Sequence, residues 1–537
     1  MDELTKIALV GTSKHGGDVT AEDHPTCALL TGVAGNAAVS GNDREERLLM
    51  RSGMRAIYDM AGRKPITEVV AVDPAPREVC RTASRKLAGL LQNALVTNAS
   101  DLLVDFLRQM QGSRIVAPPD LLPLLLDCAD PAVRKQLLPI LGERGKWLSR
   151  LNAEWSWVHQ GVSHLTDTDQ AALQKIWEEG TIVERCQVVA ILRRSNPQRA
   201  RDWVGLIFSQ EKPAHRASLL EEFTTGLSPA DEPFLESSLA DRAPSVGQVA
   251  ARMLCRLPNS ALAARMRERA SAMLSAGTKG FLRKKTRLAC APPEKIDRDW
   301  ERDGIPAKAP TGRGLRAFWA ETVLSAVPPA HWCAQFDAPP AALIAEILDD
   351  QFEEAVLLGW TEAATRFAGN DPGSAAWLTP LWEHWAGAAE RMKGSGRAAA
   401  LERMKSLLPC LSRDDAERGM LSLFTAAAGS DNVESLGLMT LLARPWSATF
   451  SEKLLALVRR VLAKQSDNTA YQWAGTLFTA ARAIPAEAFL AAQAGWEAAP
   501  AQKSSAWHVD AIQREIDKFV ETIATRQSFI MEVEAQP

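Results

Sequence analysis

The sequence predicts an all-α protein, specifically a HEAT-like α-solenoid in two segments. Three segments share one pattern at a spacing of 31 residues: 183–192, 214–223 and 245–254. Each begins with polar residues and continues as an apolar helical face, and such fixed self-similarity is typical of stacked helix pairs. Strand signals are sparse, and the best strand candidate is the short run 68–73.

The first repeat is expected at residues 124–142. Its second helix should begin at Pro131, because the missing N–H of proline has no partner in a first helical turn. Asp130 precedes it and is suited to cap that helix. In the later repeat, Gly247 stands where the other two frames have Arg185 and Arg216. This glycine either permits close helix packing or weakens the repeat.

Turn signals divide the chain into four expected regions. Proline and glycine are dense between residues 291 and 314, which predicts a long ordered or semi-ordered connection with a hinge. The regions are an N-terminal helical region (1–112), a HEAT-like repeat array (113–290), the Pro/Gly-rich connection (291–314) and a second helical segment (315–537).

Composition favours a packed protein without a strong overall field. Of 537 residues, 46% are hydrophobic, and the net charge is −3. The eight cysteines lie far apart, as expected of reduced thiols in a cytoplasmic protein. We find neither a secretory signal nor a membrane-spanning stretch. The 16 tryptophans, against two tyrosines, are expected mainly to pack helices together.

Motifs for catalysis are missing from the sequence. The stretch 11–14 resembles a phosphate loop, but it lacks the second glycine before the lysine and a preceding strand. It is expected to end the first helix. No HExxH, CxxC or GxSxG motif occurs. We therefore expect no enzymatic activity, no cofactor and no metal site.

A tryptophan-rich block interrupts the repeats and is the first candidate binding site. Aromatic and arginine side chains together are typical of interface hot spots and also of single-stranded nucleic-acid sites. A buried wedge between repeats is the structural alternative. The candidate partner-binding residues are Arg144, Lys146, Trp147, Arg150, Trp155 and Trp157.

A second candidate is a basic region at residues 252–316. It contains 16 Lys and Arg against six Asp and Glu, a net charge of +10. Lysine and arginine bind phosphates without reading bases, so the region is a candidate nucleic-acid surface. The alternatives are a solvated face and a surface for an acidic protein. Its named members are Arg265, Arg267, Arg269, Arg283, Lys284, Lys285 and Arg287.

Several blocks resemble one bacterial family of unknown function with HEAT-like repeats, over roughly residues 5–500. The chain departs from that pattern at Gly247, where arginine is expected. The blocks are the Gly-Thr at 11–12 and the segments 141–155, 225–236, 257–266, 300–304 and 327–332.

Members of that family look like gene neighbours of MoxR-type AAA ATPases, VWA-domain proteins and SWIM zinc-finger proteins. The resemblance therefore implies a scaffold or adaptor in an ATPase-associated complex. Our leading hypothesis is a non-enzymatic scaffold that binds such proteins. The alternative is nucleic-acid binding through residues 252–316.

Overall fold

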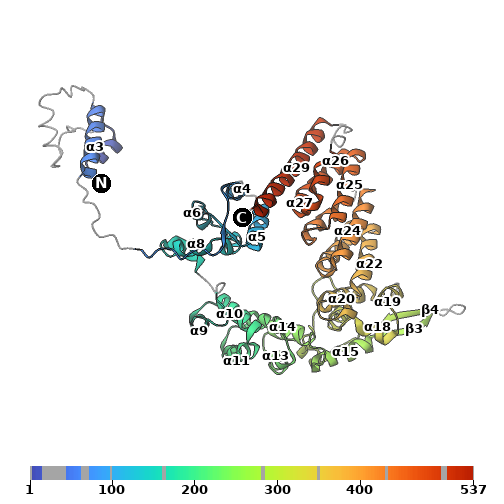
Figure 1. Cartoon of the computed structure of the whole chain (residues 1–537). Coiled ribbons are helices and arrows are strands. Elements are labelled where there is room, and N and C mark those ends of the chain that lie inside the picture. Colours follow the sequence, from blue (N-terminus) through green and yellow to red (C-terminus); the bar gives the residue numbers. More distant parts are fainter. Residues whose placement is uncertain are drawn as a thin grey trace, which may run out of the picture. The chain divides into compact units, whose positions relative to one another are not determined.

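The structure is a computed structural model of the whole chain (Figure 1). It describes residues 3–14, 44–61, 72–96, 100–159, 165–279, 285–347, 351–429, 433–496 and 505–535. These residues are predominantly helical, and the strands among them form two two-stranded sheets. The all-α prediction is confirmed. Most of the expected strand 68–73 lies outside the described residues, and Val72 and Asp73 are not in a strand.

The chain divides into two compact units, residues 1–74 and 75–537. In the first unit, helices α1 (Glu3–Val10) and α3 (Arg44–Ala61) bury Ile7 and Leu48 together. Helix α1 ends before Gly11, whose φ of +90° is a conformation that favours glycine. The expected end of the first helix at this loop is confirmed; residues 15–18 lie outside the described part.

The second unit begins with a hydrophobic cluster built from residues 83–158. Because α4 and α5 share this core with later helices, the boundary between units falls at residue 74, whereas the sequence suggested residue 112. Its elements are β1 (Arg81–Thr82), α4 (Arg85–Val96), α5 (Ser100–Gly112), β2 (Ile115–Val116), α6 (Leu122–Leu126), α7 (Pro131–Leu137), η1 (Leu138–Ile140), α8 (Gly142–Ser149) and η2 (Ala153–Val158). The two strands pair in parallel.

The expected start of α7 is confirmed. Pro131 is its first residue, and the Asp130 carboxylate accepts a hydrogen bond from the Ala132 backbone N–H at 2.8 Å. An aspartate in this position satisfies one of the helix's unpaired backbone donors.

Helix pairs follow in sequence order from residue 170. They are α9 (Gln170–Glu179), α10 (Ile182–Ser195), α11 (Pro197–Ile207), α12 (Pro213–Glu221), α13 (Glu232–Leu239), α14 (Pro244–Leu254) and α15 (Ala261–Met273). Short 3₁₀ turns separate some of them: η3 (Phe208–Gln210), η4 (Glu222–Thr224) and η5 (Pro229–Asp231). Helix α10 contacts α12, and α12 contacts α14.

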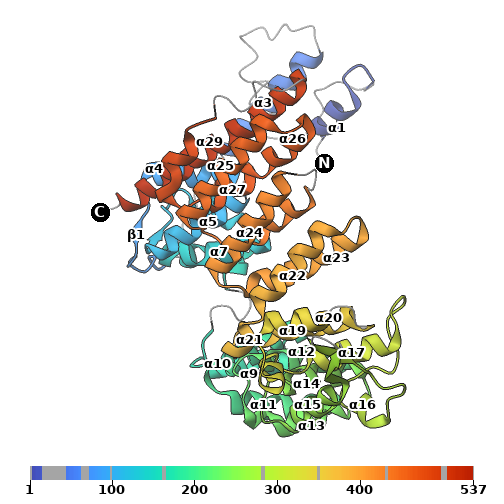
Figure 2. The same cartoon turned by 90° about the vertical axis from the view of Figure 1, so that its right-hand side faces the viewer.

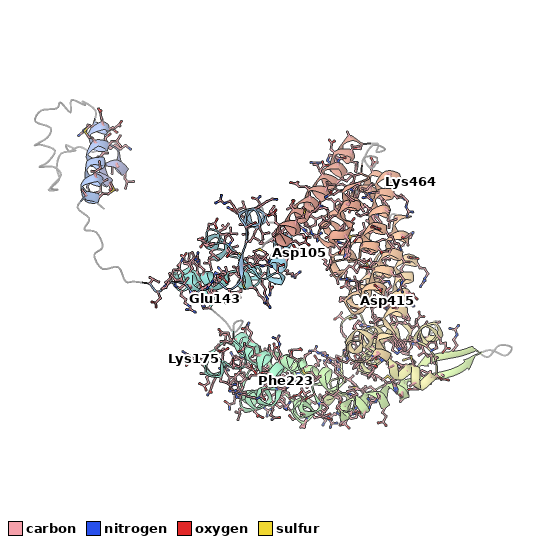
Figure 3. The ribbon with its side chains drawn as sticks, viewed as in Figure 1. Asp105, Glu143, Lys175, Phe223, Asp415 and Lys464 are labelled. Atoms are coloured by element: carbon pink, nitrogen blue, oxygen red, sulfur yellow. The ribbon has the colours of Figure 1, made fainter. Side chains whose placement is uncertain are left out.

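The spacing of 31 residues relates three segments: α10, α12 with the η4 turn that follows it, and α14. Leu192, Phe223 and Leu254 occupy equivalent positions and are all buried. Phe223, labelled in Figure 3, lies within this group of helices. The periodic apolar face predicted from the sequence is therefore the face that packs one helix pair on the next.

Equivalent arginines connect successive repeats. Arg185 donates to the Glu211 carboxylate at 2.9 Å, and Arg216 donates to Asp241 at 2.7 and 2.8 Å. The third equivalent residue is Gly247. A Cβ atom there would lie 3.3 Å from the Leu239 carbonyl oxygen. Gly247 was expected either to permit close helix packing or to weaken the repeat, and the structure supports close packing of α14 on α13.

The connection 291–314 packs against the helices on both sides of it. It contains α16 (Arg298–Arg302), and Ile305 is fully buried in the same hydrophobic cluster as the helices before and after it. Gly304, with φ of +88°, approaches α14 so closely that a Cβ would lie 2.7 Å from the Ala251 Cβ. The connection therefore packs directly on α14, beside Ala251 and the Gly247 carbonyl oxygen.

A hairpin that the sequence did not predict precedes this connection. Strands β3 (Leu274–Lys279) and β4 (Lys285–Cys290) are antiparallel, with Leu274 opposite Cys290. Neither strand has the alternating β-branched pattern that marks strands in a sequence.

The remaining helices continue the packing to the C-terminus. They are α17 (Leu315–Ser325), α18 (Ala330–Phe336), α19 (Pro340–Ile347), α20 (Glu353–Phe367), α21 (Pro372–Ala375), α22 (Leu378–Arg391), α23 (Ser395–Leu407), α24 (Arg413–Ala428), α25 (Ala448–Lys464), α26 (Asp467–Gly475), α27 (Leu477–Ala483), α28 (Phe489–Gln493) and α29 (Ala506–Glu534). The 3₁₀ segments are η6 (Leu408–Cys410), η7 (Glu434–Leu441) and η8 (Ala486–Ala488). The expected packing role of tryptophan is met by five fully buried residues: Trp332, Trp360, Trp377, Trp446 and Trp473.

Helix α29 joins the two hydrophobic clusters of the second unit. Its earlier turns pack on α26, α27 and α28, and its last turns contact α4 and α5 (Figure 1, Figure 2). Phe529 stacks on Phe106 with ring centroids 3.7 Å apart. Lys86 and Glu532 form an ion pair beside them at 2.7 Å. Residues far apart in the sequence thus share one core.

Candidate partner-binding site

The tryptophan block lies on α8 and η2. Gly142 begins α8 with φ of +63°, and the Glu78 carboxylate accepts a hydrogen bond from the Glu143 N–H at 2.7 Å. Asn152 caps η2 by accepting from the Glu154 N–H. One distant and one local contact thus fix the starts of the two short helical segments that carry the three tryptophans.

Two of the tryptophans are held by their indole N–H groups. Trp155 donates to the Asp127 carboxylate at 2.8 Å, and Trp157 donates to the Leu126 carbonyl at 3.0 Å. Both rings are half-buried against the first hydrophobic cluster. They therefore attach η2 to α6, and only their remaining surfaces face outward.

The other members of the block lie on α8 and at its end. Trp147 is half-buried, whereas Arg144, Lys146 and Arg150 are exposed. Lys146 forms an ion pair with Glu143 at 2.8 Å, one helical turn earlier. The block therefore combines packing tryptophans with exposed cations.

Several arginines of the basic region are engaged within the protein. Arg265 donates to Asp303 through Nε and Nη2 at 2.8 and 2.9 Å, and Arg269 lies 2.7 Å from the same carboxylate. Asp303 is completely buried. Arg267 donates to the Pro258 carbonyl at 2.8 Å. These contacts engage three of the region's guanidinium groups within the protein, and two of them share one buried carboxylate.

The rest of the basic region lies on the hairpin. Arg287 is half-buried on β4 and has a partner of its own within the chain. Lys285 begins β4, but its side chain is outside the described part of the structure, as are Arg283 and Lys284. The described members are thus divided between α15 and β4.

A basic concavity of about 560 Å³ lies beside Trp157. Three cationic side chains line it, Arg134 and Lys135 from α7 and Arg194 from the last turn of α10. We call this concavity the Trp157 pocket. Its lining is Pro131, Arg134, Lys135, Leu138, Trp157, Leu165, Gln187, Ala190, Ile191 and Arg194.

The guanidinium group of Arg134 is fixed in place. Its Nε donates to the Cys128 carbonyl at 2.6 Å, and its Cζ lies 5.1 Å from the centre of the Trp157 ring. A cation over an indole face is attracted by the ring's quadrupole. The sequence points to Trp157 but not to the three cations, because α7 and α10 are far apart in the chain and no motif connects them.

A second concavity, of about 710 Å³, lies between α20, α22 and α23. It mixes signs, with Glu353, Glu354 and Glu383 alongside Arg391 and Arg403. His384 also lines it, and burial lowers the pKa of this imidazole, with Glu353 opposing and Arg391 reinforcing the shift. Its mixed charge distinguishes it from the Trp157 pocket.

Two further observations concern the described residues alone. Within them, no group of three or more His, Cys, Asp or Glu side chains is arranged to hold a metal ion. No described helix has the length and apolar character needed to cross a membrane.

The described fold is that of an all-α protein whose helix pairs pack consecutively. A model for a family of unknown function, DUF5691, matches residues 3–533, and the chain belongs to this family. Comparison with curated proteins found no match. Membership in a family of unknown function is as expected, whereas HEAT-repeat identity and the gene neighbours remain predictions.

Proposed function

We propose that the protein is a non-enzymatic, cytoplasmic HEAT-like scaffold that binds protein partners. The observation that carries this proposal is the composition of the Trp157 pocket, where the exposed Lys135 and Arg194, the half-buried Arg134 and apolar side chains share one concavity. Aromatic and arginine side chains in such surroundings are enriched at protein interfaces. The partners proposed from the family resemblance are MoxR-type AAA ATPases, VWA-domain proteins and SWIM zinc-finger proteins.

The packing of the helix pairs supports a scaffold role. Arg185 and Arg216 each connect one repeat to the turn that precedes the next repeat's second helix. Such links limit motion between repeats, and a surface held in one conformation loses less entropy when a partner binds. The repeats therefore provide a fixed support for the pocket at their beginning.

Nucleic-acid binding through residues 252–316 receives less support. Arg265 and Arg269 share the buried Asp303, and Arg267 is bonded to a carbonyl oxygen. Phosphate binding depends on cations that can replace condensed counterions, and paired arginines contribute little to it.

Co-expression with each proposed partner tests the scaffold. We expect the full chain to co-elute with at least one of them as a stable complex in size-exclusion chromatography with light scattering. A chain that elutes alone in the presence of all three partner classes would contradict the proposal. A matched assay with duplex and single-stranded oligonucleotides at low salt tests the alternative.

A further inference from the structure

We propose that the Trp157 pocket binds an acidic peptide segment that carries an aliphatic or aromatic side chain. The inference rests on the proposed scaffold function and names the chemistry of the partner's contact. It follows from the charge of the lining, from the apolar residues between the charges and from the way Arg134 is held.

The lining of the pocket is positively charged. Arg134, Lys135 and Arg194 are basic, and no carboxylate is among the lining residues. Within the described part of the chain, the side chain of Lys135 forms neither an ion pair nor a hydrogen bond. Arg194 is exposed at the end of α10 and interacts electrostatically with Glu222. A chain of net charge −3 therefore has a local concavity with three positive groups, which favours an acidic ligand.

Apolar side chains lie between the charged groups of the pocket. Leu138, Leu165 and Ile191 line the same space and are all half-buried. A carboxylate-only ligand would leave their exposed surface in water, whereas an aliphatic or aromatic side chain would cover it. Burying apolar surface contributes roughly 25 cal/mol per Å², so the best ligand combines both kinds of group.

The position of Arg134 favours a peptide over a nucleic acid as the ligand. Single-stranded nucleic acids need aromatic faces on which bases stack and a basic groove that follows the backbone. The Arg134 guanidinium already covers one face of the Trp157 ring, and the indole N–H donates a hydrogen bond to the Leu126 carbonyl oxygen. The cations surround one concavity of about 560 Å³. This arrangement suits one acidic and apolar stretch of polypeptide.

Binding of a defined peptide to the full chain tests the inference. The probe is a fluorescein-labelled peptide, Glu-Leu-Asp-Asp-Trp-Glu, measured by fluorescence anisotropy. Two comparison peptides replace either its acids with glutamine and asparagine or its Leu and Trp with serine. The test variant is Lys135→Glu/Arg194→Glu. The control, Lys175→Glu/Lys212→Glu, makes the same change of charge at exposed residues outside the pocket.

We expect the parent peptide to bind the wild-type and control chains and to bind the test variant at least about tenfold more weakly. Both comparison peptides should bind more weakly, and binding should weaken with added salt because exposed charges are screened. Circular dichroism of each variant confirms folding.

Other outcomes would overturn the inference. They are equal binding to test and control variants, no binding of the parent peptide at low salt, or preferential binding of a single-stranded oligonucleotide that the test variant loses. The scaffold function is judged separately: a partner complex that survives Lys135→Glu/Arg194→Glu would contradict the pocket assignment while supporting the scaffold.

Discussion

Arg193 and Asp231 form a bidentate ion pair, and both side chains are completely buried. Nη1 and Nη2 of the arginine each lie 2.8 Å from one carboxylate oxygen. The pair joins α10 to η5, and the same guanidinium donates to the carbonyl oxygens of Thr225 and Gly226. A loop between two helix pairs is thus tied to the interior of the preceding pair.

Removing one member of this pair should be costly. We expect Asp231→Asn to lower the free energy of unfolding by about 3–5 kcal/mol, because Arg193 would remain buried without a counter-charge. The double variant Arg193→Met/Asp231→Leu should lose less stability than the sum of the losses from Arg193→Met alone and Asp231→Leu alone. Chemical unfolding measures the free energy of unfolding of each variant. Asp202→Asn, on the surface of α11, is the control and should change stability by no more than about 0.5 kcal/mol.

Two half-buried histidines should make stability depend on pH. Burial lowers the pKa of His331 and of His384 below the usual 6.5. The unfolded chain therefore takes up these protons first, so stability is highest above pH 6.5 and falls as the pH drops toward the folded pKa values. The double variant His331→Gln/His384→Gln should have a flatter profile of thermal midpoints between about pH 7 and about pH 5. An unchanged slope would contradict this assignment.

A separate loss of stability is expected in stronger acid. Burial alone would raise the pKa of Asp231 and of Asp241, but hydrogen bonds from arginines and backbone N–H groups outweigh it and lower both. Their stabilisation is complete above the ordinary pKa of 3.8 and disappears as the pH falls through the lower folded values. Asp241→Asn should reduce this acid-dependent part of the profile; a profile identical to that of the wild type would exclude Asp241 as a contributor.

Gly304 should tolerate no side chain. Gly304→Ala places a Cβ against Ala251 at a φ of +88°, and we expect a loss of about 1–3 kcal/mol. Gly205→Ala is the control, because Gly205 lies within α11 with nothing near its missing Cβ. That change should raise stability by up to about 1 kcal/mol. Thermal midpoints that shift in the same direction for both variants would contradict the packing of the connection on α14.

The last turns of α29 should stabilise α4 and α5. Phe529→Ala removes a fully buried ring stacked on Phe106, a change that typically costs about 3–5 kcal/mol. Hydrogen–deuterium exchange should accelerate in α4, α5 and the end of α29, and remain unchanged in α12 and α14. Met531→Ala, at an exposed residue of the same helix, should leave exchange unaltered.

Local sequence signals predicted much of the fold. The Asp130 cap and Pro131 at a helix start correspond to a described helix, because each acts within one turn of chain. The spacing of 31 residues also corresponds to described helices, because each repeat keeps the same apolar helical face. The β3–β4 hairpin was missed, since Ser275, Ala276 and Gly277 give no strand pattern. Nor did the sequence place α29 on α4, a contact made by residues at opposite ends of the second unit.

Charge was harder to interpret from sequence than helix position. The net charge of residues 252–316 does not show which of their cations are engaged within the protein. Asp303, one of the six acidic residues in that count, binds Arg265 and Arg269 from 38 and 34 positions away. The reverse holds at the Trp157 pocket. There, three cations from two distant helices form a positive concavity that no local window contains.

Purification of the tagged full chain from the organism that encodes it, with quantitative mass spectrometry, tests the central claim most directly. The wild-type chain and the Lys175→Glu/Lys212→Glu control should each retain the same partner in near-stoichiometric amount. Lys135→Glu/Arg194→Glu should lose most of it at equal expression. Recovery of the chain without any stoichiometric protein in all three preparations would contradict the scaffold function.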